Sequence, residues 1–299
     1  MIVSIGEILF DIFPGYRRIG GASFNFAYHL LKMGIRINFV TRVGEDEAGR
    51  DILNFMDHHG FNISQVQRDD RHETGRVSVS LDNEGNPEFN IITNVAYDFI
   101  EFNAAVSELL QSKPDLIYFG TLAQRTESGF ETIQQILSAR DRGTRCIYDV
   151  NLRPHCYSEQ IIMASLRQCD VVKMNEDELR TLKKMHGRFD SDEDFINDIL
   201  QSYGIEMVSL TRGKRGSSLY TTANSYHQEI ASTASVADTV GAGDAFAAVL
   251  AAGYVNQWPP ERIIEKATVL AGKVCGIKGA IPKDADFYKD LTDALKESR

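Results

Sequence analysis

The sequence lacks an apolar stretch that approaches the roughly 20 residues a membrane-spanning helix needs. It also lacks the marks of a secretory leader, because Met1 is followed by a short strand-like apolar segment without a basic region or a small-residue cleavage site. Cysteine is scarce: Cys146, Cys156, Cys169 and Cys275 show no C-x-x-C spacing. Free thiols in a reducing compartment are the default for this pattern. These absences predict a soluble, cytoplasmic protein.

Positive charge is also in short supply. The chain has 32 Lys and Arg against 42 Asp and Glu, which gives a formal net charge of −10. This balance argues against nucleic acid and against an anionic membrane as partners, because both are bound by neutralising phosphate. It does not exclude a small anionic substrate, since only the local field in a cleft acts on such a ligand. The hydrophobic share of 43% is that of an ordinary globular protein.

Three common phosphate-binding signatures are missing. The sequence contains no G-x-x-x-x-G-K-[ST] loop and no H-R-D and D-F-G pair. The dinucleotide fingerprint fails because Phe246 stands where its third glycine should be. A phosphate-binding loop in this chain therefore has to be of another kind.

Short apolar segments alternate with amphipathic ones along most of the chain, which implies parallel βαβ units. We predict an α/β fold with a doubly wound, mostly parallel central sheet flanked by helices. In such sheets ligands bind beyond the carboxyl ends of the strands, where Gly6, Gly120, Asp149 and Thr211 fall. The predicted strands are 2–6, 37–40, 115–119, 145–150, 170–174 and 206–211, and the predicted helices are 24–33, 46–59, 126–140, 158–168, 175–186 and 191–203; a hairpin is expected near 217–230.

The hydrophobic period changes between residues 76 and 92. Segment 76–81 alternates strictly, 83–86 contains turn residues and 88–92 returns, which is typical of a half-exposed hairpin. Because the rest of the chain consists of helix-and-strand units, this hairpin predicts a small β-sheet lid that stands off the main sheet. No linker, repeat or low-complexity run divides the chain, so we expect one domain over 1–299, with the lid formed by insertions at about 9–20 and 74–98.

The most informative stretch is 238–246, Asp-Thr-Val-Gly-Ala-Gly-Asp-Ala-Phe. Gly241 and Gly243 allow a ligand to approach the backbone closely, and an apolar helical pattern begins at Phe246. The first N–H groups of a helix are unpaired, so this segment predicts an anion cradle. Asp244 would repel a phosphate there unless it had a chemical task. Without further information, the residues of 238–246 fit this anion cradle and an ordinary helix about equally well; in the ordinary helix, glycine would precede the first turn and Asp244 would stabilise it.

Two other sets of polar residues suit a polyol or an anion. Asp11, Gly21 and Asn25 provide a carboxylate, an open backbone and an amide, as a polyol requires, although a turn aspartate and a glycine cap explain them equally well. Arg153 follows the strand 145–150 and offers a bidentate donor for phosphate or carboxylate. The alternative is a surface arginine tied to a loop carbonyl.

Two further motifs have simple structural explanations. Asn175 and Glu178 have the spacing of a helix capping box. Thr211, Gly213 and Gly216 fit a glycine turn between two strands, although the same backbone could carry the ribose and phosphates of a nucleotide.

Taken in order from Gly6 to Ala280, these motifs resemble those of the ribokinase-like (PfkB) carbohydrate kinases, nearest the fructokinase branch. The block at 238–246 is similar to the family's phosphoryl-transfer signature. The resemblance implies that Asp244 is the general base for the acceptor hydroxyl. It also implies that the amides of Gly241, Ala242 and Gly243 form the anion hole for the transferred phosphoryl group.

The resemblance assigns the remaining motifs as well. The segment from Gly20, similar to the family's G-G-A-x-x-N-x-A, implies sugar binding by Asp11, Gly21 and Asn25, with Arg153 near the acceptor or phosphate. The family's N-x-x-E and T-x-G-x-x-G motifs imply ATP contacts at Asn175, Thr211, Gly213 and Gly216, and Mg²⁺ bound through water at Glu178. Segment 274–280 resembles the family's C-terminal segment, which implies a monovalent cation such as K⁺ at backbone carbonyls of Asp238, Val240 and Gly279.

The implied enzyme transfers the γ-phosphoryl group of MgATP to a primary hydroxyl of a hexose, and a homodimer through the lid is compatible with the family. Fructose is the expected acceptor, although segment 88–98 lacks the arginine that fructokinases commonly have after the lid hairpin. Ribose, a 2-keto-3-deoxy acid and a nucleoside are therefore alternative acceptors. A degenerate sugar-binding regulator is the alternative from another class. Tyr97 or Asn94 either lines the sugar pocket or packs the lid onto the main sheet.

Overall fold

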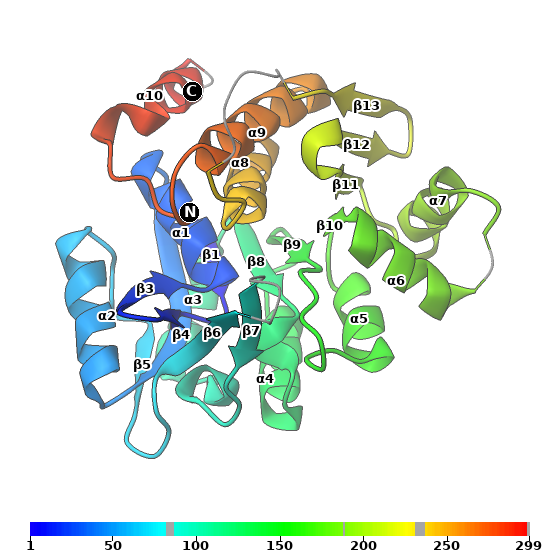
Figure 1. Cartoon of the computed structure of the whole chain (residues 1–299). Coiled ribbons are helices and arrows are strands. Elements are labelled where there is room, and N and C mark those ends of the chain that lie inside the picture. Colours follow the sequence, from blue (N-terminus) through cyan, green and yellow to red (C-terminus); the bar gives the residue numbers. More distant parts are fainter. Residues whose placement is uncertain (82–86, 188, 231–236, 298–299) are drawn as a thin grey trace.

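The computed structural model describes residues 1–81, 87–187, 189–230 and 237–297, and a nine-stranded sheet forms its frame (Figure 1). The strand order is β13-β12-β11-β10-β9-β8-β1-β4-β5. All neighbours from β11 to β5 are parallel, whereas β12 and β13 are antiparallel. The mostly parallel sheet is confirmed. Its strands are β1 Ile2–Ile5, β4 Ile37–Gly44, β5 Val66–Asp69, β8 Leu116–Gly120, β9 Arg145–Asp149, β10 Val171–Asn175, β11 Met207–Thr211, β12 Ser217–Thr221 and β13 Ser225–Gln228.

Helices cover both faces of this sheet, as the doubly wound prediction requires (Figure 1). Each face has its own apolar core, because strands buried on both sides need a helical layer on each. One layer contains α1 Ala22–Lys32, α2 Glu47–His58, α8 Ala242–Val255, α9 Pro260–Cys275 and α10 Lys289–Lys296. The other contains α3 Ala104–Gln111, α4 Glu127–Ser138, α5 Glu159–Leu166, α6 Glu176–His186 and α7 Asp192–Ser202. None of the described helices is long and apolar enough to cross a membrane.

Helix α8 is the central helix of its layer. It packs against both α1 and α9, and every residue from Ala245 to Gly253 is buried. Five of these residues are alanines, whose short side chains allow close packing of neighbouring helices. A Cβ on Gly253 would lie 2.7 Å from Ile263 of α9, which gives one measure of that closeness. The core therefore fixes where the first turn of α8 lies.

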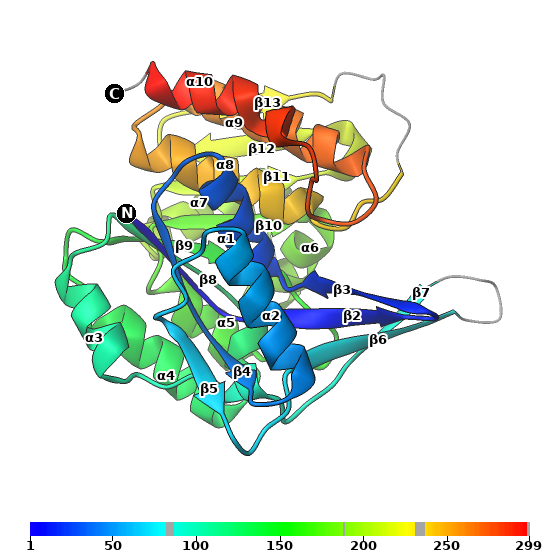
Figure 2. The same ribbon diagram turned by 90° about the vertical axis from the view of Figure 1, so that its left-hand side faces the viewer.

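A second sheet of four strands, in the order β3-β2-β6-β7, projects from the body of the molecule (Figure 2). The parallel pairing of β2 with β6 joins the two predicted insertions in one sheet. The small sheet that the sequence predicts is thus present, while the predicted turn at 83–86 lies outside the described residues. The strands are β2 Leu9–Phe13, β3 Tyr16–Gly20, β6 Gly75–Leu81 and β7 Pro87–Ile91.

Tyr97 fastens the small sheet to the main body. It lies in the short 3-10 helix Ala96–Phe99, is fully buried, and shares a cluster with Leu9 and Val77. Its ring fits against Gly75, where a Cβ would lie 2.5 Å from a ring carbon. Of the two roles open for Tyr97, the packing role is the one observed, and Asn94 is exposed.

Strand β5 and helices α3, α9 and α10 are absent from the sequence predictions. Of the four residues of β5, Val66–Asp69, only Val66 is apolar, so no periodic pattern identifies the segment. It becomes a strand because it pairs with β4, and because buried Asp69 accepts backbone N–H bonds at 2.8 and 2.9 Å and pairs with Arg42 at 2.7 Å. Edge strands of this kind depend on tertiary partners.

The hydroxyl groups of Tyr97 and Tyr118 give a matched test of this packing. Both residues are fully buried, but the Tyr97 hydroxyl has no hydrogen-bond partner among the described residues, whereas that of Tyr118 donates to Asp149 at 2.9 Å. Tyr97→Phe is expected to leave the free energy of unfolding within about 0.5 kcal/mol or to raise it, and Tyr118→Phe to lower it by about 1 to 3 kcal/mol. Urea unfolding measures both; a large loss in Tyr97→Phe alone would contradict the packing role.

Candidate active site

The first turn of α8 forms an amide cradle, defined here as the backbone N–H groups of Gly241 to Gly243. Gly241 caps the helix in the left-handed region with φ 81, and a Cβ there would lie 2.2 Å from that of Ala280. Both constraints require glycine. The first intrahelical bond of this turn runs from Ala245 N to Gly241 O at 2.9 Å. Ala242 N also donates to the Thr239 carbonyl, at 3.4 Å. The first N–H groups of a helix commonly bind anions.

Asp244 follows the cradle and contacts Asn25 of α1. Asn25 Nδ2 donates to Asp244 Oδ2 at 2.8 Å, across 219 residues of sequence. Asn25 Oδ1 is buried and has no hydrogen-bond partner among the described residues. Burial raises the pKa of Asp244 to about 6, against the opposing effects of the Asn25 bond and of the Lys173 charge. The structure thus joins two of the predicted residues in a partly desolvated base.

A buried ion pair lies behind the cradle. Lys173 Nζ of β10 is 3.0 and 3.2 Å from the carboxylate oxygens of Asp149 at the end of β9. A Cβ on Gly243 would lie 3.0 Å from the same ammonium, so the positive charge lies against the amides. Burial alone would lower the pKa of Lys173, but Asp149, Glu178 and Asp244 raise it above its ordinary value.

No role was predicted for Lys173. The sequence feature that could have identified it is a lysine inside a largely apolar strand segment, because lysine is rarely buried without a partner. Asp149 was predicted to lie at a strand end, consistent with a shared cleft; it is the last residue of β9, at the carboxyl edge of the sheet, and its side chain is fully buried.

Asp11 lies on the small sheet, with its carboxylate over Gly20. A Cβ on Gly20 would lie 2.7 Å from Asp11 Oδ2. Burial raises the pKa of Asp11 to about 6, and the charges of Arg153 and Arg18 oppose that rise. Arg153 is exposed, and its Nη1 donates to the Leu152 carbonyl at 3.3 Å, the loop contact named as its alternative role. Its charge also lowers the pKa of Asp244, so one guanidinium acts on both carboxylates.

Gly21 precedes α1 where the chain approaches itself closely. A Cβ on Gly21 would lie 2.6 Å from the Glu7 carbonyl, so a side chain there would displace the backbone. The buried Glu7 carboxylate accepts from Ala22 N at 2.8 Å and from Ser23 Oγ at 3.2 Å, and burial raises the pKa of Glu7. Glu7 therefore occupies the start of α1. This role was not predicted, although Glu7 is separated from the end of β1 by Gly6 alone.

Asn175 and Glu178 form the capping box that their spacing predicts at the start of α6. Glu178 Oε2 accepts from Asn175 N at 2.7 Å, and Asn175 Oδ1 accepts from Glu178 N at 2.9 Å. Glu178 Oε1 also accepts from Leu152 N at 3.0 Å, which ties α6 to the loop that carries Arg153. Burial raises the pKa of Glu178, against the charge of Lys173.

These contacts limit how Glu178 can act on a metal ion. Both of its oxygens already accept amide N–H groups, and the residue is 4% exposed. Within the described ranges, no group of three or more His, Cys, Asp or Glu side chains is suited to hold a metal directly. The donor set fits Mg²⁺ held mainly by phosphate and water, with Glu178 outside the first layer of ligands.

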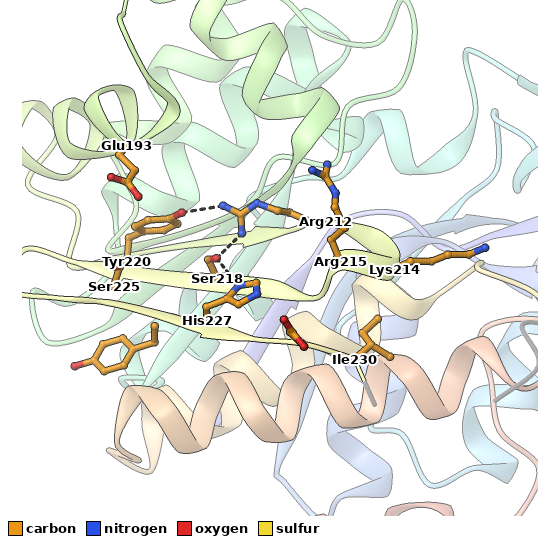
Figure 3. A pocket seen from close by; sticks show the side chains of 11 residues that line it. Glu193, Arg212, Lys214, Arg215, Ser218, Tyr220, Ser225, His227 and Ile230 are labelled. Carbon is orange, nitrogen blue, oxygen red and sulfur yellow. Dashed lines mark hydrogen bonds between the residues drawn. The ribbon is translucent and has the colours of Figure 1, made fainter. Parts of the chain in front are cut away.

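Thr211, Gly213 and Gly216 lie together where β11 turns into β12. Arg212 N donates to the Gly216 carbonyl at 2.8 Å and closes this loop. A cavity of about 640 Å³ lies beside it (Figure 3), and Arg212, Lys214 and Arg215 are among its lining residues. In Figure 3 the Arg212 guanidinium points toward Ser218 and Tyr220, and its bond to the Tyr220 hydroxyl is 2.8 Å long. Asp11 and Asp244 are not in the lining of this cavity.

Asp238 joins two loops near the cradle. Its carboxylate accepts from Val240 N at 3.1 Å and from Gly279 N at 3.0 Å. The Cys275 carbonyl accepts from Ala237 N and Asp238 N at 2.8 and 3.2 Å. The three residues predicted for a monovalent cation, Asp238, Val240 and Gly279, thus belong to one hydrogen-bonded unit.

The arrangement as a whole suits phosphoryl transfer to an alcohol. It combines a carboxylate of raised pKa, an amide cradle backed by a buried ammonium, and a second carboxylate on a separate small sheet. Fixed donors around a developing negative charge are the main requirement of that reaction.

Comparisons with known proteins agree with this chemistry. The family model described as pfkB family carbohydrate kinase matches residues 16–286. A fructokinase of Salmonella typhimurium is 28% identical over an alignment 303 residues long, which covers 96% of this chain and 96% of that protein. A 5-dehydro-2-deoxygluconokinase of Geobacillus kaustophilus is 26% identical over 266 residues, 86% of this chain and 78% of that protein.

Solved structures share the whole fold. An uncharacterized sugar kinase from Pyrococcus horikoshii has a TM-score of 0.84 at 22% identity, covering 100% of this chain and 99% of that one. A fructokinase with bound ATP from Xylella fastidiosa has a TM-score of 0.83 at 18% identity, covering 100% of this chain and 99% of that one. A fructokinase double mutant from Vibrio cholerae, in a form with fructose, ADP and potassium ion, has 0.79 at 22% identity, covering 96% and 97%.

The fold and the site therefore define a carbohydrate kinase. The chain belongs to the pfkB family of carbohydrate kinases, as its sequence motifs indicate.

The burial of Asp244 leads to a prediction about stability. Its carboxyl group has a pKa of about 6 when folded and an ordinary value of 3.8, so the fold loses stability as pH rises from about 3.8 to about 6 and levels off above that. Asp244→Asn removes this cost and keeps an acceptor for Asn25. Urea unfolding is expected to show a stability gain about 1 kcal/mol larger at pH 8 than at pH 5. The exposed Asp57→Asn serves as control, and an equal gain at both pH values would contradict the raised pKa.

Proposed function

We propose that this kinase transfers the γ-phosphoryl group of ATP to a primary hydroxyl of a hexose, with fructose as the expected acceptor. The observation that carries the proposal is the contact between Asn25 and Asp244 directly beside the amide cradle. The proposal of fructose is supported by relatives, 26 to 28% identical, that are named as fructokinases.

The acceptor is bound between the small sheet and α1. Asn25 Nδ2 is committed to Asp244, but Asn25 Oδ1 remains able to accept from a sugar hydroxyl. Asp11 accepts from further hydroxyls, and Gly21 leaves its backbone accessible. The small sheet then acts as a lid that excludes water, which otherwise competes with the sugar as phosphoryl acceptor.

In the transfer step, the acceptor oxygen forms a bond to the γ-phosphorus while the bond from that phosphorus to the β–γ bridging oxygen breaks. The acceptor proton passes to Asp244, and ADP is the leaving group. Because the transition state is loose, a weak carboxylate base suffices. The amides of Gly241, Ala242 and Gly243 stabilise the transferred group, and the nearby Lys173 ammonium strengthens their field.

The nucleotide and its ions are assigned to neighbouring loops. Asn175, Thr211, Gly213 and Gly216 bind ATP, and Glu178 orients Mg²⁺ through water. Mg²⁺, when bound, neutralises phosphate charge. The backbone carbonyls of Asp238, Val240 and Gly279 are proposed to hold K⁺; the potassium-bound Vibrio cholerae fructokinase supports this assignment by similarity of fold.

A carboxylated sugar is the second candidate acceptor. The charges of Arg153 and Arg18 both act on Asp11, and two cations beside the acceptor site favour an anionic group. The relatives named as 5-dehydro-2-deoxygluconokinases also support a carboxylated sugar as the acceptor. A coupled assay of ADP release across neutral sugars, sugar acids and nucleosides separates these acceptors. Release with none of them would favour a sugar-binding regulator without catalysis.

The role of Asp244 predicts the effect of removing the base. Asp244→Asn is expected to lower kcat by roughly 10² or more, because general bases commonly contribute that much. The dissociation constant of the acceptor should change by less than about threefold, since Asn25 and Asp11 remain. Steady-state kinetics and calorimetry measure these quantities. Near-full turnover would remove Asp244 from the mechanism.

The two raised carboxyl pKa values predict an unusual pH profile. Asp244 and Asp11 both have a pKa of about 6, so both become protonated below it. The logarithm of kcat/KM is expected to fall with a limiting slope of about two per pH unit below pH 6, and of about one in Asp11→Asn. A slope of one in the unaltered enzyme would show that only one of the two groups matters.

A further inference from the structure

Two adjacent arginines of β3 point in different directions. Side chains alternate along a strand, so neighbours lie on opposite faces of the small sheet. Arg17 pairs with Asp51 of α2. Arg18 instead reaches the loop before α8, where its Nη1 is 3.8 Å from Asp238 Oδ2. A Cβ on Gly279 would lie 3.1 Å from the same nitrogen, so the guanidinium lies where Asp238 meets the C-terminal loop.

Asp238, the partner of Arg18, holds the chain segment that leads into the amide cradle. The Asp238 carboxylate accepts from Val240 N and from Gly279 N, and Val240 directly precedes Gly241, the cap of α8. The position of the cradle therefore depends on the unit that Asp238 ties together. Among the described residues, Arg18 is the one cationic side chain within 4.0 Å of this carboxylate. A carboxylate so near a phosphate-binding loop repels phosphate unless its charge is offset.

Arg18 also lies directly across from Asp11. The two residues are paired in the register of β2 and β3, and the charge of Arg18 acts on the Asp11 carboxylate. Strand β2 thus carries Asp11, which is predicted to bind the acceptor, and the paired strand β3 carries Arg18, which contacts Asp238. Any shift of the small sheet that brings Asp11 to an acceptor also moves Arg18 relative to the cradle.

We propose that Arg18 is a positioning residue for phosphoryl transfer. From the small sheet it holds and neutralises Asp238, so that the amide cradle is fixed when the sheet lies over the acceptor. The proposal rests on the proposed function, in which Asp11 binds the acceptor and the cradle binds the transferred group. It gives the small sheet a second task besides excluding water.

The matched variants are Arg18→Gln and Arg17→Gln. Each removes a guanidinium from the same strand, and each guanidinium lies over an aromatic ring, Arg17 at 4.5 Å from Phe10 and Arg18 at 5.0 Å from Tyr16. With a neutral sugar as acceptor, Arg18→Gln is expected to lower kcat about tenfold and to leave the acceptor KM within about threefold, because the lost contact acts in the transition state. Arg18→Lys keeps the charge and should recover part of kcat. Arg17→Gln should stay within about twofold in both constants.

Hydrogen–deuterium exchange tests the same contact without catalysis. Peptides covering 237–247 and 276–282 should exchange faster in Arg18→Gln and at the original rate in Arg17→Gln, with thermal unfolding checking that both variants fold. Equal kcat losses in the two variants, a loss confined to KM, or unchanged exchange in Arg18→Gln would each overturn the proposal. If the unaltered protein phosphorylates no acceptor, the proposed function fails, whereas the exchange comparison still decides whether Arg18 holds the loop.

Discussion

The negative charge of Asp244, half-buried at the start of a helix, is the constraint on which the site depends. An ionised carboxylate there is unfavourable unless neighbouring dipoles and charges offset its loss of water. Asn25 supplies a hydrogen bond from α1, Lys173 supplies a positive charge from β10, and the helix supplies its amides. The close packing of α8 between α1 and α9 keeps these groups in register. A base with a pKa near 6 is the result.

The pair of Lys173 and Asp149 shows how the sheet delivers charge to this point. A buried ion pair contributes little to stability, since desolvation opposes the attraction between the charges. Here the pair is completed by the Tyr118 hydroxyl and places the ammonium against Gly243. Its position at the carboxyl ends of β9 and β10 follows from the parallel sheet. The ion pair is therefore better explained by its place in the site than by a contribution to folding.

Most of the fold follows from local patterns. The apolar strand runs, the capping box at Asn175 and the change of period after residue 75 each indicate their elements, because burial and capping act over a few residues. Strand β5 and helices α3, α9 and α10 were not predicted; β5 is largely polar, and α3 and α10 are short. The attachment of the small sheet through Tyr97 and Gly75 could not be derived either, since it depends on two segments that meet only in the folded chain.

By itself, the sequence determined the family, and it predicted the glycines of the amide cradle and the candidate site residues Asp244 and Asn25, because these depend on motifs with fixed spacing. Only the tertiary structure decided that Lys173 lies against Gly243, that Glu7 is used to cap α1, and that Arg18 reaches Asp238. These contacts join residues far apart in the chain. Their energies depend on burial and on distance between charges, which no local pattern encodes.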